Sequence, residues 1–210
     1  MIVVPAYHEA GAIGAVVVDL LKVAPVIVVD DASGDGTADA ARAAGAFVVE
    51  LDDNRGYGNA IDAGFREAVA RGFRYVVTAD GDGQHDPADV ARAAEEVASG
   101  RYDLVVGIRP VVVRPVERLC ALYAKKVFGI VDPLCGLKAY DVRFYEEYGS
   151  FDRRRSVGTE LMTFALRHGA RWDQWPISIR PRTNGDSRFY RSLRGNLRIL
   201  RSLRALVAVR

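Results

Sequence analysis

The stretch YVVTADGDGQHDP, residues 75–87, runs from a short apolar segment directly into two carboxylates, Asp80 and Asp82. Its first four residues have the composition of a buried strand. Asp86 before Pro87 is typical of a helix start, with Asp as the cap and Pro in the first turn. Two carboxylates this close repel each other unless a positive charge lies between them. The stretch therefore predicts a strand, an acidic turn and a helix.

Short Val-rich runs alternate with Ala-rich stretches of helical composition over the first half of the chain. The runs lack alternation of apolar and polar residues, so we expect strands covered on both faces. Such strand–helix alternation predicts an α/β fold, a Rossmann-like, mainly parallel sheet flanked by helices. The expected strands are residues 2–7, 26–31, 47–51, 75–80 and 103–108, and the expected helices are residues 11–22, 36–44, 58–71 and 87–99.

Polar residues follow each expected strand. Ligands of doubly wound sheets bind at the carboxyl ends of the strands, so five polar strand ends at one edge indicate a binding site rather than five unrelated caps. These segments are Tyr7-His8-Glu9, Asp30-Asp31-Ala32-Ser33, Asp52-Asp53-Asn54, Asp80-Gly81-Asp82 and Arg109.

The acidic turn suits a hard cation. Asp80, Asp82 and Gln84 point to one side if the backbone stays extended. Their oxygens suit Mg2+ or Mn2+, whose shell the phosphates of a nucleotide would complete. An EF-hand is excluded, because its fifth, sixth and twelfth positions would be Gln84, His85 and Ala91. GYGNAI at 56–61 also fails as a dinucleotide fingerprint, since Ile replaces its last Gly.

Composition favours one domain with an uneven charge distribution. The chain has 210 residues, half of them hydrophobic, and a net charge of +2. Residues 180–210 hold nine arginines and one acid, or +8, so the remainder carries −6. Cys120 and Cys135 have no metal-binding spacing, and we expect a reducing, cytoplasmic setting. We expect neither a signal peptide nor a membrane-spanning helix.

The basic end of the chain has the pattern of a helix in a membrane interface. We expect a catalytic domain over 1–187 and a basic amphipathic helix over 188–210, each exposed Arg adding about 1 kcal/mol at an anionic surface. The open alternative is a helix whose leucines dock on the sheet; nucleic-acid binding is not expected, because no aromatic residues interleave. Its expected faces are Leu193, Leu197, Leu200, Leu203 and Val207, opposite Arg191, Arg194, Arg198 and Arg201.

Five motifs resemble glycosyltransferase family 2, and within it they are most similar to the dolichyl-phosphate mannose synthase branch. No stretch of the sequence corresponds to the transmembrane helices that many of those relatives carry after the catalytic domain. The motifs are VVPAYHEAGAI (3–13), VVDDASGDGT (28–37), NRGYGNAIDAGF (54–65), ADGDGQHDP (79–87) and DPLCGLKAYD (132–141).

The resemblance implies a GT-A fold, a nucleotide-sugar donor, Mg2+ or Mn2+, and inversion at the anomeric carbon. It also implies roles for single residues at the donor side. Asp80 would lie near the ribose and the metal, while Asp82 and Gln84 would hold the metal on the diphosphate, with Asp82 as a catalytic residue. The nucleoside would be lined by Pro5, Tyr7 and Glu9, with Glu9 on the ribose, and its base contacted by Asp31.

On the acceptor side, the resemblance implies basic residues that grip a phosphate. Arg109, a catalytic candidate, follows a strand, and Arg114 and Arg118 lie beyond it as acceptor-binding candidates; the latter two could equally be surface residues. A guanidinium suits phosphate because it forms a planar fork. A hydroxyl acceptor would need a general base, for which Asp132 is the first candidate and Glu160 the second.

Two residues depart from the family pattern: His8 stands where Asn is usual, and Tyr57 where Lys is commoner. The expected function is transfer of a hexose, first mannose from GDP-mannose, to a polyprenyl or dolichyl phosphate at the cytoplasmic face of a membrane. One alternative is transfer to a sugar hydroxyl of a lipid-linked glycan. Another is a non-catalytic nucleotide-sugar-binding regulator, against which the intact Asp80, Asp82 and Gln84 argue.

Overall fold

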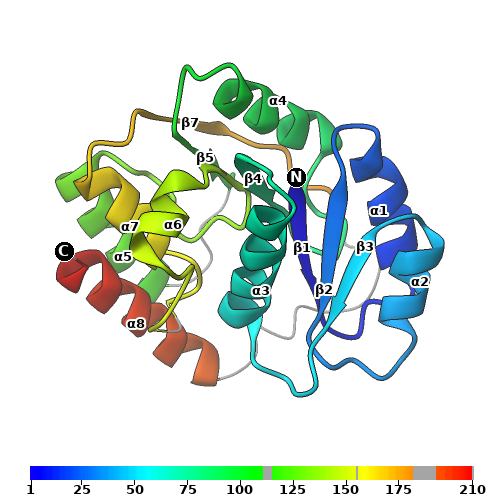
Figure 1. Ribbon diagram of the computed structural model, residues 1–210. Helices are drawn as coiled ribbons and strands as arrows, with labels where there is room; N and C mark the ends of the chain where they lie inside the picture. Colours follow the sequence, from blue (N-terminus) through cyan, green and yellow to red (C-terminus); the bar gives the residue numbers. More distant parts are fainter. Residues whose placement is uncertain (111–114, 155, 182–192, 210) are drawn as a thin grey trace.

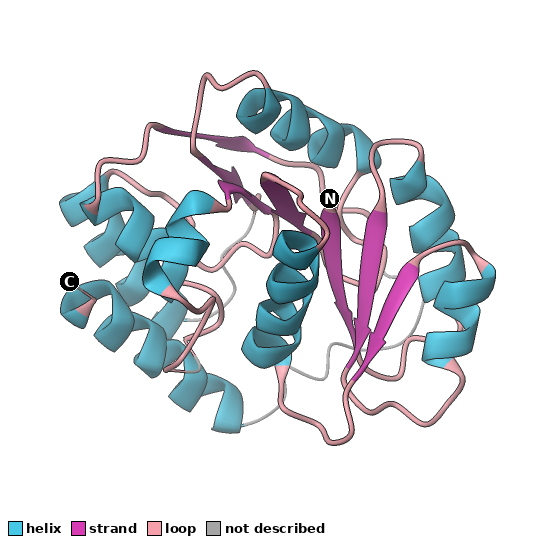
Figure 2. Ribbon diagram, in the orientation of Figure 1, coloured by secondary structure: helices cyan, strands magenta, loops and turns pink. Residues whose placement is uncertain are grey.

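The computed structural model describes residues 1–110, 115–154, 156–181 and 193–209, with the side chains of the last segment described from Ile199 onward. It contains a seven-stranded sheet with helices on both sides (Figures 1 and 2). The strands are β1 (Ile2–Ala6), β2 (Val26–Asp30), β3 (Phe47–Glu50), β4 (Tyr75–Thr78), β5 (Leu104–Ile108), β6 (Lys138–Asp141) and β7 (Trp172–Pro176).

The helices of the described residues follow the expected ones closely in the first half of the chain. α1, α2, α3 and α4 each begin and end within two residues of the predicted bounds. The helices are α1 (Ile13–Leu21), α2 (Thr37–Ala43), α3 (Tyr57–Ala70), α4 (Pro87–Ala98), α5 (Pro115–Phe128), α6 (Arg143–Tyr148), α7 (Glu160–Arg167) and α8 (Leu193–Ala208).

The strand order is β3-β2-β1-β4-β6-β5-β7. All neighbouring strands are parallel except β6, which runs antiparallel to β4 and β5. The expected α/β, mainly parallel sheet is therefore confirmed. The order reverses between β1 and β4, and ligands of doubly wound sheets bind at such a switch point. The polar strand ends of β1 and β4 thus lie side by side.

Both faces of the sheet are buried, as the Val-rich runs predict. Val3, Ile27 and Val29 pack with residues of α3, α5, α7 and α8, whereas Ile2 and Val28 pack on the opposite face with α1, α2 and α4. Successive strand residues point to opposite faces. This explains why the runs carry no polar alternation.

α4 begins directly after the acidic turn. The side chain of Asp86 accepts a hydrogen bond from the backbone N–H of Ala88 at 2.9 Å, and Pro87 is the first helical residue. The predicted cap is therefore confirmed. It anchors the end of the acidic turn against the sheet.

The C-terminal helix α8 packs on α5 and α7 (Figure 1). Its buried residues are Ile199, Ser202, Ala205 and Leu206, none more than 1% exposed. Hydrogen bonds stabilise the packing, among them those from Cys120 Sγ to the Ile199 carbonyl at 3.4 Å, from the Ser202 hydroxyl to the carbonyl of Ser156, and from Arg167 Nη2 to the Leu206 carbonyl at 3.2 Å.

Leu203 of the expected leucine face is partly buried against the core, but the rest of the buried face among the described side chains of α8 differs from that prediction. Leu200 and Val207 of that face are 45% and 52% exposed. Helix docking, the alternative left open by the sequence, is therefore correct for the described part of α8. Leu206, which is not on the expected face, is the fully buried leucine, and the supports are helices rather than the sheet. Leu193, Leu197, Arg191, Arg194 and Arg198, and the expected boundary at 187/188, lie outside the described side chains.

Candidate active site

Asp80 and Asp82 lie in the turn that links β4 to α4. The backbone N–H of Asp80 donates to His85 Nδ1 at 3.1 Å, and Asp82 Oδ1 accepts from the N–H of Gln84 at 3.0 Å. Side chains that bond the backbone two residues on are typical of tight Asx turns. The turn is therefore fixed by its own polar side chains, and it holds two carboxylates at the carboxyl end of β4.

The Asp80 carboxylate is bordered by three other residues. Tyr57, the first residue of α3, places its hydroxyl 3.3 Å from Asp80 Oδ1. His85 Nε2 lies 3.7 Å from Asp80 Oδ2. A Cβ on Gly136 would lie 2.7 Å from both oxygens, so only glycine fits at that position beside the carboxylate. The Asp80 side chain nevertheless stays 34% exposed and open to a ligand.

The acidic turn offers a cation fewer protein ligands than a self-contained metal site. Among the described residues, no three His, Cys, Asp or Glu side chains gather closely enough to hold an ion. Two carboxylates and an amide still match the incomplete shells that Mg2+ keeps in nucleotide sites, where phosphates and waters supply the rest. Asp80, Asp82 and Gln84 therefore stay the predicted ligands of a cation that would arrive with a diphosphate.

Arg109 and Asp132 form the second charged group at this edge. Arg109 Nε and Nη2 lie 2.7 and 2.9 Å from the two Asp132 oxygens, and the Arg109 backbone N–H donates to Oδ2 at 3.1 Å. Glu117, in the first turn of α5, lies 3.5 Å from Arg109 Nη2. Arg109 is thus held by two buried carboxylates, and Asp132, at 2% exposure, is occupied as its bidentate partner.

Lys138 is a buried lysine beneath this edge that the sequence analysis did not single out. It is 2% exposed, and its Nζ donates to the Cys135 carbonyl at 2.5 Å. Burial, the largest cause, lowers the pKa of Lys138, whereas the charges of Asp132 and Asp80 oppose that shift. A lone Lys in the apolar run CGLKAY is the signal that could have identified it.

The residues expected around the nucleoside lie at the ends of β1 and β2. Tyr7 is 39% exposed and packs edge-on against the His8 ring at 4.2 Å. The backbone N–H of Glu9 donates to Thr37 Oγ1 at 2.9 Å. His8 has φ 56°, a left-handed conformation that is uncommon outside glycine and concentrates at functional sites.

Asp31 has a clear structural task. Its two oxygens accept the backbone N–H groups of Arg55 at 2.7 Å and Gly56 at 2.8 Å, and the residue is 3% exposed. Asp31 therefore links the end of β2 to the start of α3, and its expected contact with a base stays a prediction.

Pro5, in β1, lies beside the acidic turn, because a Cβ on Gly81 would come within 3.0 Å of the Pro5 carbonyl oxygen.

The remaining candidates are spread more widely. Glu160 is fully buried and accepts hydrogen bonds from the Tyr148 hydroxyl and, at 2.8 Å, from the backbone N–H of Arg154. Burial raises the pKa of Glu160, as expected for a carboxyl held in the interior. Arg118 is exposed on α5, and Arg114 lies outside the described residues. The structure thus brings together Asp80, Asp82, Gln84 and their neighbours but keeps Glu160 enclosed.

Comparisons with family models and with curated proteins indicate the same family. The model of glycosyl transferase family 2 matches residues 1–119. The undecaprenyl-phosphate mannosyltransferase of Micrococcus luteus is 32% identical over an alignment of 210 residues, gaps included. The alignment covers 89% of this chain and 85% of that protein. The polyprenol monophosphomannose synthase of Mycolicibacterium smegmatis is 32% identical over a shorter segment, 52% of this chain and 44% of that one.

Solved structures confirm the expected GT-A fold. Glucosyl-3-phosphoglycerate synthase from Mycobacterium tuberculosis, solved with Mn2+, uridine diphosphate and phosphoglyceric acid, superposes with a TM-score of 0.74. The match has 20% sequence identity and covers 100% of this chain and 78% of that chain. No helix within the described residues is long and apolar enough to span a bilayer.

Proposed function

The chain belongs to glycosyltransferase family 2, and from that premise we propose that this glycosyltransferase moves a hexose from a nucleotide sugar to a polyprenyl phosphate. We take GDP-mannose as the first donor to test. The observation that carries the proposal is the turn of Asp80 and Asp82 at the carboxyl end of β4, at the same sheet edge as Arg109 and Asp132. The names of the relatives from Micrococcus luteus and Mycolicibacterium smegmatis support a polyprenyl acceptor and mannose.

Asp80, Asp82 and Gln84 would hold Mg2+ or Mn2+ together with the donor diphosphate. A bound cation neutralises the charge that develops on the departing nucleoside diphosphate. The chain's own contribution is to keep both carboxylates in a rigid turn, with His85 and the Asp86 cap at its end. In the proposed reaction, an acceptor oxygen attacks the anomeric carbon as its bond to the diphosphate breaks, with inversion.

The pairing of Asp132 supports a phosphate acceptor over a hydroxyl acceptor. A phosphate is ionised at neutral pH, so it needs no general base, whereas a sugar hydroxyl does. Asp132, the first candidate for that base, accepts three hydrogen bonds from Arg109, and Glu160, the second, is fully buried. In this proposal Asp132 orients Arg109, and Arg109 and Arg118, with Arg114, bind the acceptor phosphate.

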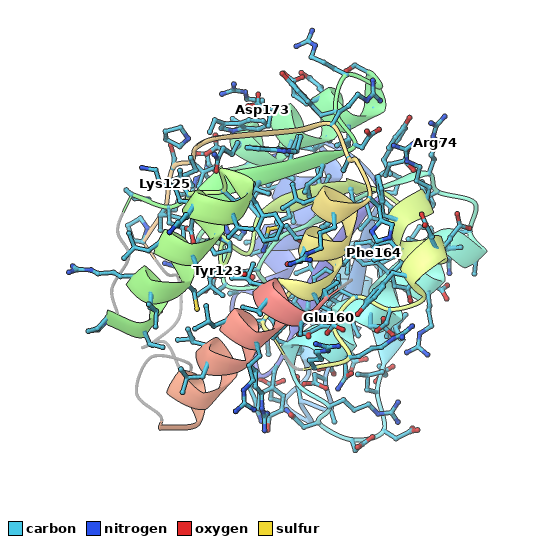
Figure 3. The ribbon with its side chains drawn as sticks, turned by 90° about the vertical axis from the view of Figure 1, so that its left-hand side faces the viewer. Arg74, Tyr123, Lys125, Glu160, Phe164 and Asp173 are labelled. Atoms are coloured by element: carbon cyan, nitrogen blue, oxygen red, sulfur yellow. The ribbon has the colours of Figure 1, made fainter. Side chains whose placement is uncertain are left out.

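The acceptor lipid would be reached through the α5–α8 surface, which we define as Leu119, Leu122, Lys125, Leu200 and Val207. These five residues are exposed, Leu122 to 67%. Figure 3 shows α5 and α8 side by side on the face turned to the viewer, with Lys125 labelled. Exposed apolar side chains among cations suit an anionic membrane surface, and we propose peripheral binding at the cytoplasmic face.

A transfer assay tests the proposal. The chain would be incubated with GDP-[14C]mannose or UDP-[14C]glucose, Mn2+ and undecaprenyl phosphate in anionic vesicles, and the organic phase counted. We expect label in the lipid from GDP-mannose, released by mild acid as a glycosyl phosphate should be, and loss of transfer in Asp82→Ala. Acid-stable product formed only with a lipid-linked glycan would instead establish the hydroxyl acceptor. Donor binding without transfer to either acceptor would favour the non-catalytic regulator.

A further inference from the structure

Tyr57 stands at the junction of three elements that meet at Asp80. We propose that Tyr57 is a positioning residue of the cation site, whose phenol donates to Asp80 and so sets the orientation of that carboxylate. This inference rests on the proposed function, because it concerns the cation that Asp80 and Asp82 would bind. No role at the site is otherwise assigned to this side chain.

The phenol is held in place from the sheet. Tyr57 is the first residue of α3, and the two preceding residues, Arg55 and Gly56, donate their backbone N–H groups to the Asp31 carboxylate at 2.7 and 2.8 Å. Asp31 itself directly follows β2. The end of β2 therefore fixes the first turn of α3, and the first turn of α3 places the Tyr57 hydroxyl 3.3 Å from Asp80 Oδ1.

α3 has little freedom to slide along the sheet. A Cβ on Gly58 would lie 2.5 Å from the Asp152 carboxylate, and a Cβ on Gly64 would overlap the Val3 side chain of β1. The helix is therefore in close contact at both of these glycines, with a loop and with a central strand. Packed interiors of this kind hold side-chain positions to a fraction of an ångström.

The chemistry of the phenol suits the role. A tyrosine hydroxyl carries one proton that it can donate to a carboxylate oxygen. Because the donor is neutral, it orients Asp80 without cancelling the negative charge that attracts a cation, as an ammonium in that place would.

His85 and Gly136, the other residues beside Asp80, are less suited to orient its carboxylate. His85 Nδ1 accepts the Asp80 backbone N–H, so the ring proton lies on Nε2, which is 3.7 Å from Oδ2 and too far for a strong hydrogen bond. Gly136 has no side chain with which to hold the carboxylate. Among the described residues, Tyr57 is the side chain whose hydrogen bond to the Asp80 carboxylate we observe.

The test compares Tyr57→Phe with wild type in a Mn2+ titration, followed by the electron paramagnetic resonance signal of free Mn2+, at saturating GDP and, separately, UDP. Phe retains the ring that fills the space, so the variant should fold, which circular dichroism checks. Tyr75→Phe is the matched control, since Tyr75 begins β4 at the opposite edge of the sheet. Partners that orient metal ligands are typically worth 10- to 100-fold in metal affinity, and the long 3.3 Å bond suggests about tenfold.

The possible outcomes distinguish failure of this inference from failure of the proposed function. A Mn2+ affinity about tenfold weaker in Tyr57→Phe, with metal-free nucleotide affinity and melting temperature unchanged and Tyr75→Phe like wild type, supports the inference. Equal Mn2+ affinity in Tyr57→Phe and wild type overturns the inference and leaves the proposed function standing. No nucleotide-dependent Mn2+ binding by wild type overturns both.

Discussion

Replacing Gly136 with alanine is the smallest change that should displace Asp80. The added Cβ would lie 2.7 Å from both Asp80 oxygens, whereas ordinary contacts begin at 3.4 Å. The difference, 3.4 − 2.7, means that the carboxylate or the Gly136 backbone must move by about 0.7 Å. Gly136 has no positive φ, so backbone strain adds nothing to this displacement.

The consequence for activity follows from the tolerance of catalytic geometry. Reacting groups need placement within roughly 0.5 Å, and a 1 Å error costs about 100-fold. We therefore expect kcat/KM for the donor to fall about 10- to 100-fold in Gly136→Ala, measured with the labelled-sugar transfer assay. Overpacking should lower the free energy of unfolding by about 1–3 kcal/mol, which a urea titration measures.

Gly14→Ala is the matched control. Gly14 lies in α1, has no positive φ, and its added Cβ would meet only the Ala40 carbonyl oxygen at 3.9 Å. Alanine in a helix is favoured by up to about 1 kcal/mol, so this variant should be as stable or more stable and fully active. Wild-type kcat/KM in Gly136→Ala, or an equal loss in Gly14→Ala, would refute the placement of Asp80 in the site.

Three further variants test the packing and the charges. Tyr140→Phe should raise the unfolding free energy by about 1 kcal/mol in urea titrations, because the buried Tyr140 hydroxyl finds no hydrogen-bond partner in the described part of the chain; a loss of stability would show a hidden partner. Leu206 is fully buried and Leu200 is 45% exposed, so Leu206→Ala should lower the unfolding free energy by about 2–5 kcal/mol and Leu200→Ala by under about 1 kcal/mol. Leu200→Ala should also weaken cosedimentation with vesicles. Equal losses of unfolding free energy would contradict the docked face of α8. Hydrogen bonds from Arg171 hold the pKa of Asp103 below its usual 3.8, so they stabilise the fold above that pH, and this stabilisation is lost as the pH falls through the lowered pKa. The melting temperature of Asp103→Asn should therefore be lower than that of wild type at pH 7 and should depend less on pH below about pH 4. Melting temperatures of variant and wild type that fall in parallel with pH would exclude this coupling.

The first half of the fold is predictable from the sequence because its strands are Val-rich apolar runs with helices between them. β6 is harder to recognise, since two of its four residues, Lys138 and Asp141, are charged, and its antiparallel direction depends on pairing with β4 and β5. The buried face of α8 is not predicted from the sequence because it includes Ser202 and Ala205, whose small side chains do not mark an apolar face. Tertiary packing, rather than helical spacing, decides which face docks.

At the site, the acidic turn and its helix cap follow from residues adjacent in the chain, so the sequence predicts them. Contacts between residues distant in the sequence are not predicted in this way. Tyr57 meets Asp80 across 23 positions, and Arg109 meets Asp132 across another 23. The predicted base Asp132 is tied to Arg109 only because β5 and the segment before β6 meet at one edge. Such pairings depend on strand order, which composition and spacing do not specify.

A thermal-shift measurement tests the central claim, a cation-assisted nucleotide diphosphate site at the end of β4. GDP and UDP would each be added with and without Mn2+, to wild type and to Asp82→Ala. A ligand at about 100 times its Kd adds roughly 2.7 kcal/mol to the stability of the folded state. We predict a Mn2+-dependent shift with GDP in wild type that Asp82→Ala loses; a shift with UDP alone would change the donor. No shift in wild type, or an equal shift in Asp82→Ala, would contradict the account.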